Sequence, residues 1–148
     1  MAVGSDSESN LTREITAHLE GKGIDLLRCG SLAGETADYV DAARDVAEAV
    51  GTGACEQGLI FCNTGTGVTI VANKIPGVRA ALCPDSYSAS IARLANNANV
   101  IVLGMRLTGE IHAKEIVDTW LATGPSTEER RVSFHRKTEE VDRRYRRT

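Results

Sequence analysis

The sequence predicts a Rossmann-like α/β sandwich of three layers, in which a five-stranded parallel sheet lies between helices and an extended helix follows at the C-terminal end. Short apolar segments alternate along the chain with longer segments of helical periodicity. Gly, Pro, Asp or Asn residues flank the short segments, as is typical of strands. Strands that alternate with helices form parallel sheets covered on both faces. A chain of 148 residues is long enough for one such core, so we expect a single domain over 1–148.

Five strands are expected, each short, apolar and bounded by turn-forming residues. The clearest of them is Gly-Leu-Ile-Phe-Cys, an apolar segment that stops at a glycine-rich turn. The remaining four show the same combination of an apolar core and polar or glycine-rich ends. We place the strands at 1–4, 24–29, 58–62, 78–83 and 99–103.

Six helices are expected between and after the strands. Ser9 precedes an amphipathic segment that ends near Gly21, so the first helix has both a start and a stop signal. Gly109 opens a segment whose apolar residues share one face: Ile111, Ile116, Val117 and Trp120. We place the helices at 9–22, 36–50, 66–74, 86–95, 109–122 and 127–146.

The composition indicates a soluble globular protein, with 42% apolar and 25% charged residues. No apolar segment approaches the roughly 18 residues that a membrane span needs. The chain begins Met-Ala-Val-Gly-Ser-Asp, without a basic leader or a long apolar stretch. We therefore expect a cytoplasmic protein with no membrane partner.

The four cysteines are Cys29, Cys55, Cys62 and Cys83. They form no CxxC pair and have no metal-like spacing with the three histidines. Cysteines in a reducing compartment remain free thiols. We therefore expect four free thiols, no metal and no cofactor.

Charge is distributed unevenly along the chain. Residues 1–129 carry 9 Lys and Arg against 17 Asp and Glu, a net charge of −8, whereas residues 130–148 carry 8 against 3, a net charge of +5. The basic end, with Arg143, Arg144, Arg146 and Arg147, is compatible with nucleic-acid binding. A solvated helix end that complements the helix dipole or an acidic neighbouring subunit explains it more simply. We therefore expect no nucleic-acid partner.

The segment 58–74 carries the most informative local pattern. An apolar strand ends in Cys62, the chain turns through Asn63-Thr64-Gly65-Thr66-Gly67, and a helical pattern follows. A strand, a tight turn and a helix start present several unpaired backbone N–H groups at one point. Phosphate binding, stabilisation of an enediolate and an activated cysteine are all compatible with this arrangement.

Other polar segments are expected beside this turn. Ligands of open parallel sheets bind beyond the carboxyl ends of the strands. The predicted strand ends therefore collect four segments along one edge of the sheet, at 4–7, 62–67, 83–85 and 104–106.

Six sequence blocks, spread over nearly the whole chain, carry a resemblance to a known family. They are GSD at 4–6, ADYVD at 37–41, CNTGTG at 62–67, ANKIPGVRAALC at 72–83, NNANVIVLGMR at 96–106 and AKEIVDTWL at 113–121. In this order they resemble the ribose-5-phosphate isomerase B and galactose-6-phosphate isomerase family of sugar-phosphate isomerases.

The resemblance implies that the chain interconverts aldose and ketose phosphates through a cis-enediolate without a metal. Such a reaction needs a base that moves a proton between C1 and C2, and donors that stabilise the oxyanion. In the branch of the family that matches, the base is the cysteine of the turn, which is Cys62. The other branch uses a glutamate where this chain has Val68. Thr64 matches the hydroxyl of the turn, which relays a proton or holds a sugar oxygen.

The resemblance also implies a set of substrate-binding residues and a homodimer or tetramer. The family builds its pocket between two subunits, and the C-terminal helix of one chain reaches toward the site of the other. The backbone amides of the turn match the anion hole, Asp6 matches a residue that binds sugar hydroxyls, Asn96 matches an asparagine near the reacting end, and two arginines match phosphate ligands. The implied binding set is Asp6, Ser7, Asn63, Gly65, Thr66, Gly67, Asn96, Arg106 and Arg131.

Several positions depart from the family pattern. The usual GSDHAG reads GSDSESN, so Ser7 replaces a histidine that contacts the ligand. The histidine of the RxHN segment, which opens the furanose ring, falls on Ala95. In the C-terminal GGRHxxR pattern, Thr127 replaces a phosphate arginine and Glu128 a histidine. Asn63 replaces the glycine after the base, and asparagine tolerates positive φ better than most residues.

Simpler structural roles compete with some of these assignments. Taken alone, Cys62 is better explained as a small apolar residue at the end of a buried strand. Within the CNTGTG turn of the family pattern, the role as base is favoured instead. Asp6 fits a turn cap, and Arg106 a surface ion pair. Arg130 takes the phosphate-binding role of Arg131 if the match to the family's C-terminal pattern is shifted by one residue. The histidines have no family role and are expected to be ordinary surface residues: His18, His112 and His135.

Three hypotheses about function follow. The first is an isomerase of ribose 5-phosphate and ribulose 5-phosphate. The second is an isomerase of a tetrose phosphate such as erythrulose phosphate, which needs no ring-opening histidine because its phosphorylated oxygen cannot close a furanose ring. The third is a binding or partner subunit of a heteromer with weak or absent activity, because four polar ligand groups of the family pattern are lost. One subunit type of galactose-6-phosphate isomerases also lacks the ring-opening histidine.

Overall fold

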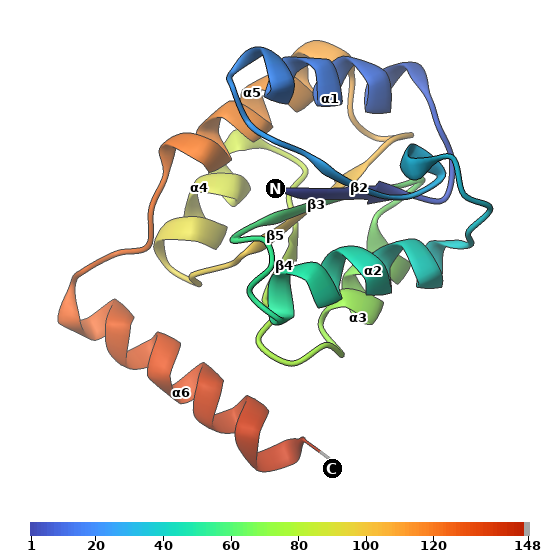
Figure 1. The fold of residues 1–148 in the computed structure, drawn as a ribbon. Coiled ribbons are helices and arrows are strands. Elements are labelled where there is room, and N and C mark those ends of the chain that lie inside the picture. Colours follow the sequence, from blue (N-terminus) through green and yellow to red (C-terminus); the bar gives the residue numbers. More distant parts are fainter. Residues whose placement is uncertain (147–148) are drawn as a thin grey trace.

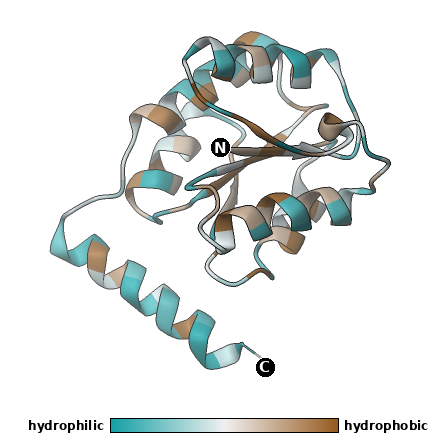
Figure 2. Cartoon of the chain, viewed as in Figure 1, coloured by the Kyte–Doolittle hydropathy of each residue, from teal (hydrophilic) through white to brown (hydrophobic). Residues whose placement is uncertain are grey.

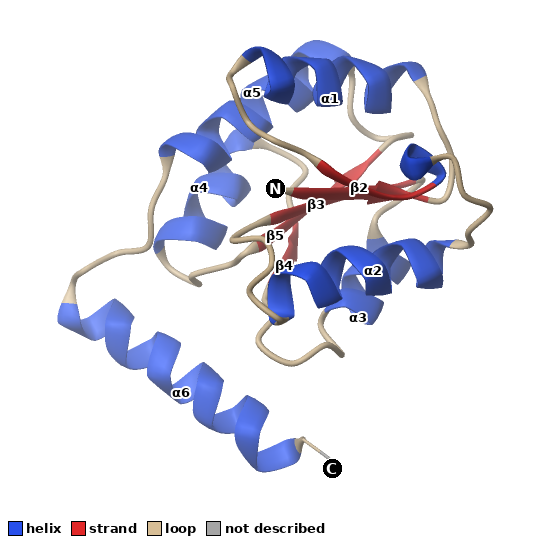
Figure 3. Cartoon of the chain, in the orientation of Figure 1, coloured by secondary structure: helices blue, strands red, loops and turns tan. Residues whose placement is uncertain are grey.

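A computed structural model of the protein describes residues 1–146. Arg147, the last arginine of the basic end, and Thr148 lie outside the described residues. Five strands form one sheet in which every neighbouring pair is parallel, in the order β2-β1-β3-β5-β4 (Figure 3). They are β1 (Ala2–Ser5), β2 (Leu27–Gly30), β3 (Gly58–Cys62), β4 (Ala80–Leu82) and β5 (Val100–Gly104). The predicted α/β class with a five-stranded parallel sheet is confirmed.

Helices cover both faces of the sheet (Figure 1). One face carries α1 (Asn10–Gly21), α4 (Ser86–Leu94) and α5 (Glu110–Ala122), and the other carries α2 (Tyr39–Gly51) and α3 (Thr66–Ala72). Side chains of a strand alternate between the two faces. In β3, Leu59 and Phe61 accordingly join the core under α1, α4 and α5, whereas Ile60 joins the core under α2 and α3.

Local signals position the helix starts. The Ser9 side chain accepts a hydrogen bond from the Thr12 amide and the Thr12 hydroxyl accepts one from the Ser9 amide, a capping box that begins α1. Asp38 caps α2 in the same way, with its carboxylate accepting from the Asp41 amide. The predicted start of that helix at 36 was therefore too early. A short 3-10 helix, η1 (Ser31–Ala33), lies ahead of it.

Other strand boundaries differ from the predicted ones because hydrogen-bonded pairing with the neighbouring strand determines where a strand begins and ends. The strand expected from 24 begins at Leu27, where the amide donates to the Met1 carbonyl at 2.9 Å and the register with β1 starts. The strand expected over 78–83 is shorter, because β4 pairs with β5 only over Ala80–Leu82. In α5, Ile116, Val117 and Trp120 are buried as expected. Ile111 is 79% exposed, so its predicted place on the buried face was wrong: it lies in the first turn of α5, outside the packed part of the helix.

The last helix, α6 (Glu129–Tyr145), extends away from the body of the chain (Figure 1). None of its residues is buried, and its ribbon is coloured mostly as hydrophilic, with isolated hydrophobic residues (Figure 2). Phe134 is 47% and Tyr145 is 70% exposed. The strands point away from α6, so this helix lies on the side of their amino ends (Figure 1).

Candidate active site

The turn after β3 is joined to the end of β5 at the carboxyl edge of the sheet. Cys62 lies opposite Gly104 in the strand register. The Cys62 carbonyl accepts a hydrogen bond from the Met105 amide at 2.6 Å, and the Asn63 carbonyl accepts one from the Arg106 amide at 3.0 Å. The backbone of Arg106 therefore lies beside the turn, and the Arg106 side chain is exposed.

The turn takes a left-handed conformation at one residue before α3 begins. Gly65 has φ of 87° and forms the N-cap of α3, with no side chain capping the helix. The first helical hydrogen bond runs from the Thr69 amide to the Gly65 carbonyl at 3.2 Å. The amides of Gly65, Thr66, Gly67 and Val68 precede that bond, so they are the four donors at the helix start that have no partner within the helix. The Thr64 and Thr66 hydroxyls lie 3.0 Å apart at the same point.

Close packing explains why glycines occupy the turn. A Cβ on Gly65 would lie 2.5 Å from Leu82 Cδ1, and one on Gly67 would lie 2.9 Å from the Tyr39 ring. A Cβ on Gly104 would lie 2.8 Å from the Thr64 carbonyl oxygen. Neighbouring strands and α2 thus hold the turn from several sides, which gives it a defined shape.

The four cysteines differ in their surroundings, and all are free thiols. Burial, reinforced by Asp45 and Cys55, raises the pKa of Cys29 from 9.0 to about 11. Burial, reinforced by Asp85, raises the pKa of Cys83 from 9.0 to about 12. Both thiols therefore remain protonated near neutral pH. Cys62 is only partly buried and lies at the strand end, next to the exposed turn.

Asp6 and Ser7 follow β1, which is the neighbour of β3 in the sheet. The Asp6 carbonyl accepts from the Ser31 hydroxyl at 2.7 Å, and the Ser7 amide donates to the Ser5 hydroxyl at 3.2 Å. Because β1, β3 and β5 are adjacent and parallel, their carboxyl ends bring three predicted site segments to one edge. These segments contain Asp6 and Ser7, Cys62 to Gly67, and Arg106.

Two predicted site residues lie elsewhere in the same chain. Asn96 follows α4 and precedes β5, so it is at the amino end of the sheet. Arg131 lies on α6, where its guanidinium is 3.7 Å from the Glu128 carboxylate. Neither residue is brought to Cys62 within one chain.

The histidines have more specific partners than the sequence suggested. The His18 ring pairs with Asp118 at 2.7 Å, and the His112 ring lies 3.1 Å from the Pro84 carbonyl. His135 on α6 lies 2.8 Å from the Ala95 carbonyl and is partly buried. No sequence signal links position 135 to position 95, because that contact depends on where α6 lies.

Two features are absent from residues 1–146. No group of three or more His, Cys, Asp and Glu side chains in that range is arranged to hold a metal ion. No helix there has the length and apolar character to cross a membrane.

The fold and the site define an α/β protein that presents a cysteine and a glycine-rich turn at the carboxyl edge of a parallel sheet. Residues 1–138 match the family described as Ribose/Galactose Isomerase. The chain therefore belongs to the ribose/galactose isomerase family.

Individual relatives are similar over most of their length. A D-erythrulose-4-phosphate isomerase of Pectobacterium atrosepticum is 44% identical over 123 residues, 82% of this chain and 81% of that protein. Ribose-5-phosphate isomerase B of Escherichia coli is 42% identical over 111 residues, 75% of this chain and 74% of that protein. A solved structure of ribose-5-phosphate isomerase B from Clostridium thermocellum has a TM-score of 0.90 at 40% identity and covers 98% of both chains.

Proposed function

We propose that this chain is an aldose–ketose isomerase that moves a proton between C1 and C2 of a small sugar phosphate, with Cys62 as the base. The observation that carries the proposal is the position of Cys62 at a strand end, directly before a turn whose helix-start amides are open. A base and preorganised donors at one point are what an enediolate intermediate needs. Membership of an isomerase family supports the same reaction.

Each residue at this edge has a role in the proposed reaction. The amides of Gly65, Thr66 and Gly67 stabilise the oxyanion, and Thr64 relays a proton or holds a sugar oxygen. Asn63 lies next to the base in the same exposed turn. Asp6 and Ser7 bind sugar hydroxyls, and Arg106 binds the phosphate, since a guanidinium forms charge-assisted hydrogen bonds with phosphate oxygens.

A second copy of the chain supplies Asn96 and Arg131 in this proposal. Asn96 lines a groove beside α6 at the amino end of the sheet and Arg131 lies on α6, whereas Cys62 lies at the carboxyl end of β3. The basic end carries a net charge of +5 against −8 for the rest, which favours docking of α6 on another copy. We therefore infer a homodimer, alone or paired into a tetramer, as the active unit. The four free thiols of the chain are what a reducing compartment such as the cytoplasm maintains, so we infer that location.

The default substrate pair is ribose 5-phosphate and ribulose 5-phosphate, the activity in the name of the Escherichia coli relative. A tetrose 4-phosphate is the second candidate. Ala95 stands where the family has its ring-opening histidine, and a tetrose 4-phosphate is acyclic because its O4 is phosphorylated. The name of the Pectobacterium relative supports that candidate.

A direct assay decides among these substrates and the weakly active subunit. Purified protein is supplied with tetrose, pentose and hexose phosphates in turn, and kcat/KM is measured for each. The proposal predicts turnover of a tetrose or pentose phosphate by this chain alone. No turnover of any sugar phosphate, with activity restored only by a related subunit, would replace it with the heteromer hypothesis.

A further inference from the structure

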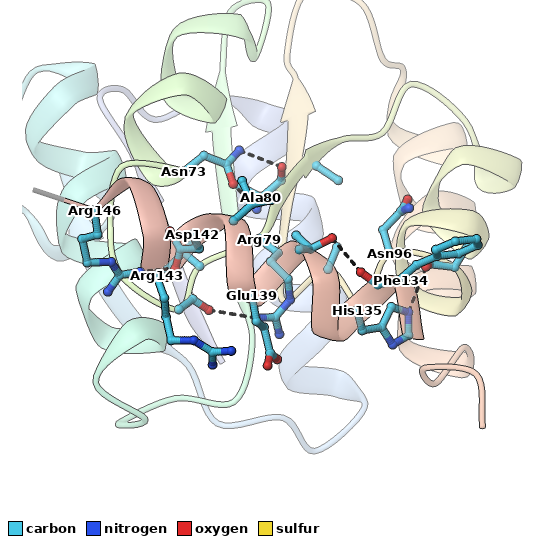
Figure 4. Close-up of a pocket in the computed structure, with 17 residues that line it drawn as sticks. Asn73, Arg79, Ala80, Asn96, Phe134, His135, Glu139, Asp142, Arg143 and Arg146 are labelled. Carbon is cyan, nitrogen blue, oxygen red and sulfur yellow. Dashed lines mark hydrogen bonds and ion pairs between the residues drawn. The ribbon is translucent and has the colours of Figure 1, made fainter. Parts of the chain in front are cut away.

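A groove of about 880 Å³ lies between α6 and the amino end of the sheet (Figure 4). Its walls come from the loop before β4, the loop between α4 and β5, and one side of α6. Asn96, Phe134 and His135 lie at the same end of the groove (Figure 4). The groove thus contains one predicted substrate-binding residue and one histidine that the proposed reaction does not yet use.

The hydrogen bond of His135 determines which ring nitrogen is available. Its Nε2 lies 2.8 Å from the Ala95 carbonyl oxygen, which can only accept a hydrogen bond. Nε2 therefore carries a hydrogen, and in the neutral ring Nδ1 has the free lone pair. Within residues 1–146 this is the only hydrogen bond of the ring. An imidazole is thus anchored on the backbone of position 95, where the side chain itself is a methyl group.

We propose that His135 is the acid–base group that opens the furanose ring of a pentose phosphate bound to the neighbouring copy of the chain. The proposal rests on the proposed function, which places Asn96 and α6 at that neighbour's site. Among the lining residues within 1–146, His135 carries the one imidazole, a side chain whose two ring nitrogens can accept a proton on one side and donate one on the other.

The proposed step transfers one proton and needs no other reactant. Nδ1 takes the proton of the O1 hydroxyl, and the electron pair of that O–H bond forms the C1=O1 double bond. The C1–O4 bond breaks, and its electron pair remains on O4. The imidazolium then gives the same proton to O4. The product is the open-chain aldehyde, which Cys62 can convert to the enediolate.

The test separates ring opening from the later proton transfer. Ribose 5-phosphate is cyclic, whereas ribulose 5-phosphate is acyclic because its O5 is phosphorylated. Consumption of ribose 5-phosphate therefore needs ring opening, and incorporation of solvent deuterium at C1 of ribulose 5-phosphate does not. Both rates are measured by NMR for the wild type, His135→Gln and His18→Gln. Gln keeps an N–H for the Ala95 carbonyl but has no basic nitrogen, and His18 is a matched histidine paired elsewhere with Asp118.

General acid–base groups contribute roughly 10²- to 10⁴-fold to rates, and spontaneous ring opening limits the observable loss. We expect His135→Gln to lower ribose 5-phosphate consumption at least ~10-fold and to leave deuterium exchange within ~2-fold, with His18→Gln unaffected. Ala95→His added to His135→Gln should restore consumption. Equal losses in both readouts, or no loss in either, would overturn the role of His135. A wild-type chain with neither pentose phosphate activity would overturn the role of His135, and only a chain that also fails on tetrose phosphates would refute the proposed function itself.

Discussion

Gly65→Ala tests whether packing around the turn determines its shape. Gly65 has φ of 87°, and a left-handed conformation costs a residue with a Cβ roughly 1–2 kcal/mol. The new Cβ would also lie 2.5 Å from Leu82 Cδ1 and 3.0 Å from Val102 Cγ1. Val102 is fully buried and cannot move away, so overpacking adds about 1–3 kcal/mol. The variant should therefore lose roughly 2–5 kcal/mol of unfolding free energy.

Gly34→Ala is the matched control, because Gly34 has φ of 78° but no atom within 4 Å of the added Cβ. It should lose only the conformational part, roughly 1–2 kcal/mol. Urea unfolding measures both variants, and with m of about 1–3 kcal/mol/M a loss of ~3 kcal/mol shifts the midpoint by roughly 1–3 M. Equal midpoints for the two variants would show that the contacts around Gly65 do not constrain the turn.

Three further predictions concern pH, the phosphate and assembly. Burial raises the folded-state pKa values of Cys29 and Cys83 to about 11 and 12. The contribution of these thiols to the free energy of unfolding should therefore be complete below pH 9 and be lost as the pH rises toward those values. Urea midpoints that stay constant from pH 8 to 11 would argue against buried thiols. Arg106→Ala should raise KM for phosphorylated substrates roughly 10- to 150-fold, since hydrogen bonds to charged groups contribute about 1.5–3 kcal/mol, and an unchanged KM would place the phosphate elsewhere. Deletion of 127–148 should abolish activity and weaken the proposed dimer while the sheet stays folded. A truncated chain that is dimeric in sedimentation and fully active would exclude a contribution of α6 to the site.

The parts of the fold that local chemistry decides could be predicted from the sequence. β3 ends at Cys62 as expected, because the apolar segment stops at the turn that Gly65 makes possible. The start of α1 follows from the Ser9 cap, which is complete within four residues. The carboxyl-edge cluster of Asp6, Cys62 and Arg106 also follows, because parallel strands end at one edge.

The features that depend on long-range packing could not be predicted in this way. The start of β2 at Leu27 depends on its register with β1, and the exposure of Ile111 depends on where α5 meets its neighbours. The contact of His135 with Ala95 joins residues that are 40 positions apart, and His135 lies on a helix with no buried residue. No local sequence pattern therefore predicts this contact.

The most direct test of the proposed chemistry is proton exchange by Cys62→Ser, with Cys55→Ser as the control. A serine hydroxyl is far less acidic than a thiol, so almost none of it is deprotonated near neutral pH and it is a poor base there. The turn amides remain in place in this variant. Solvent deuterium incorporation into the tetrose or pentose phosphate that the wild type turns over is followed by NMR. Cys62→Ser should lower that rate at least ~100-fold, as expected for loss of a general base, while Cys55→Ser exchanges normally. Exchange by Cys62→Ser at the wild-type rate would contradict the account, because another group would then have to be the base.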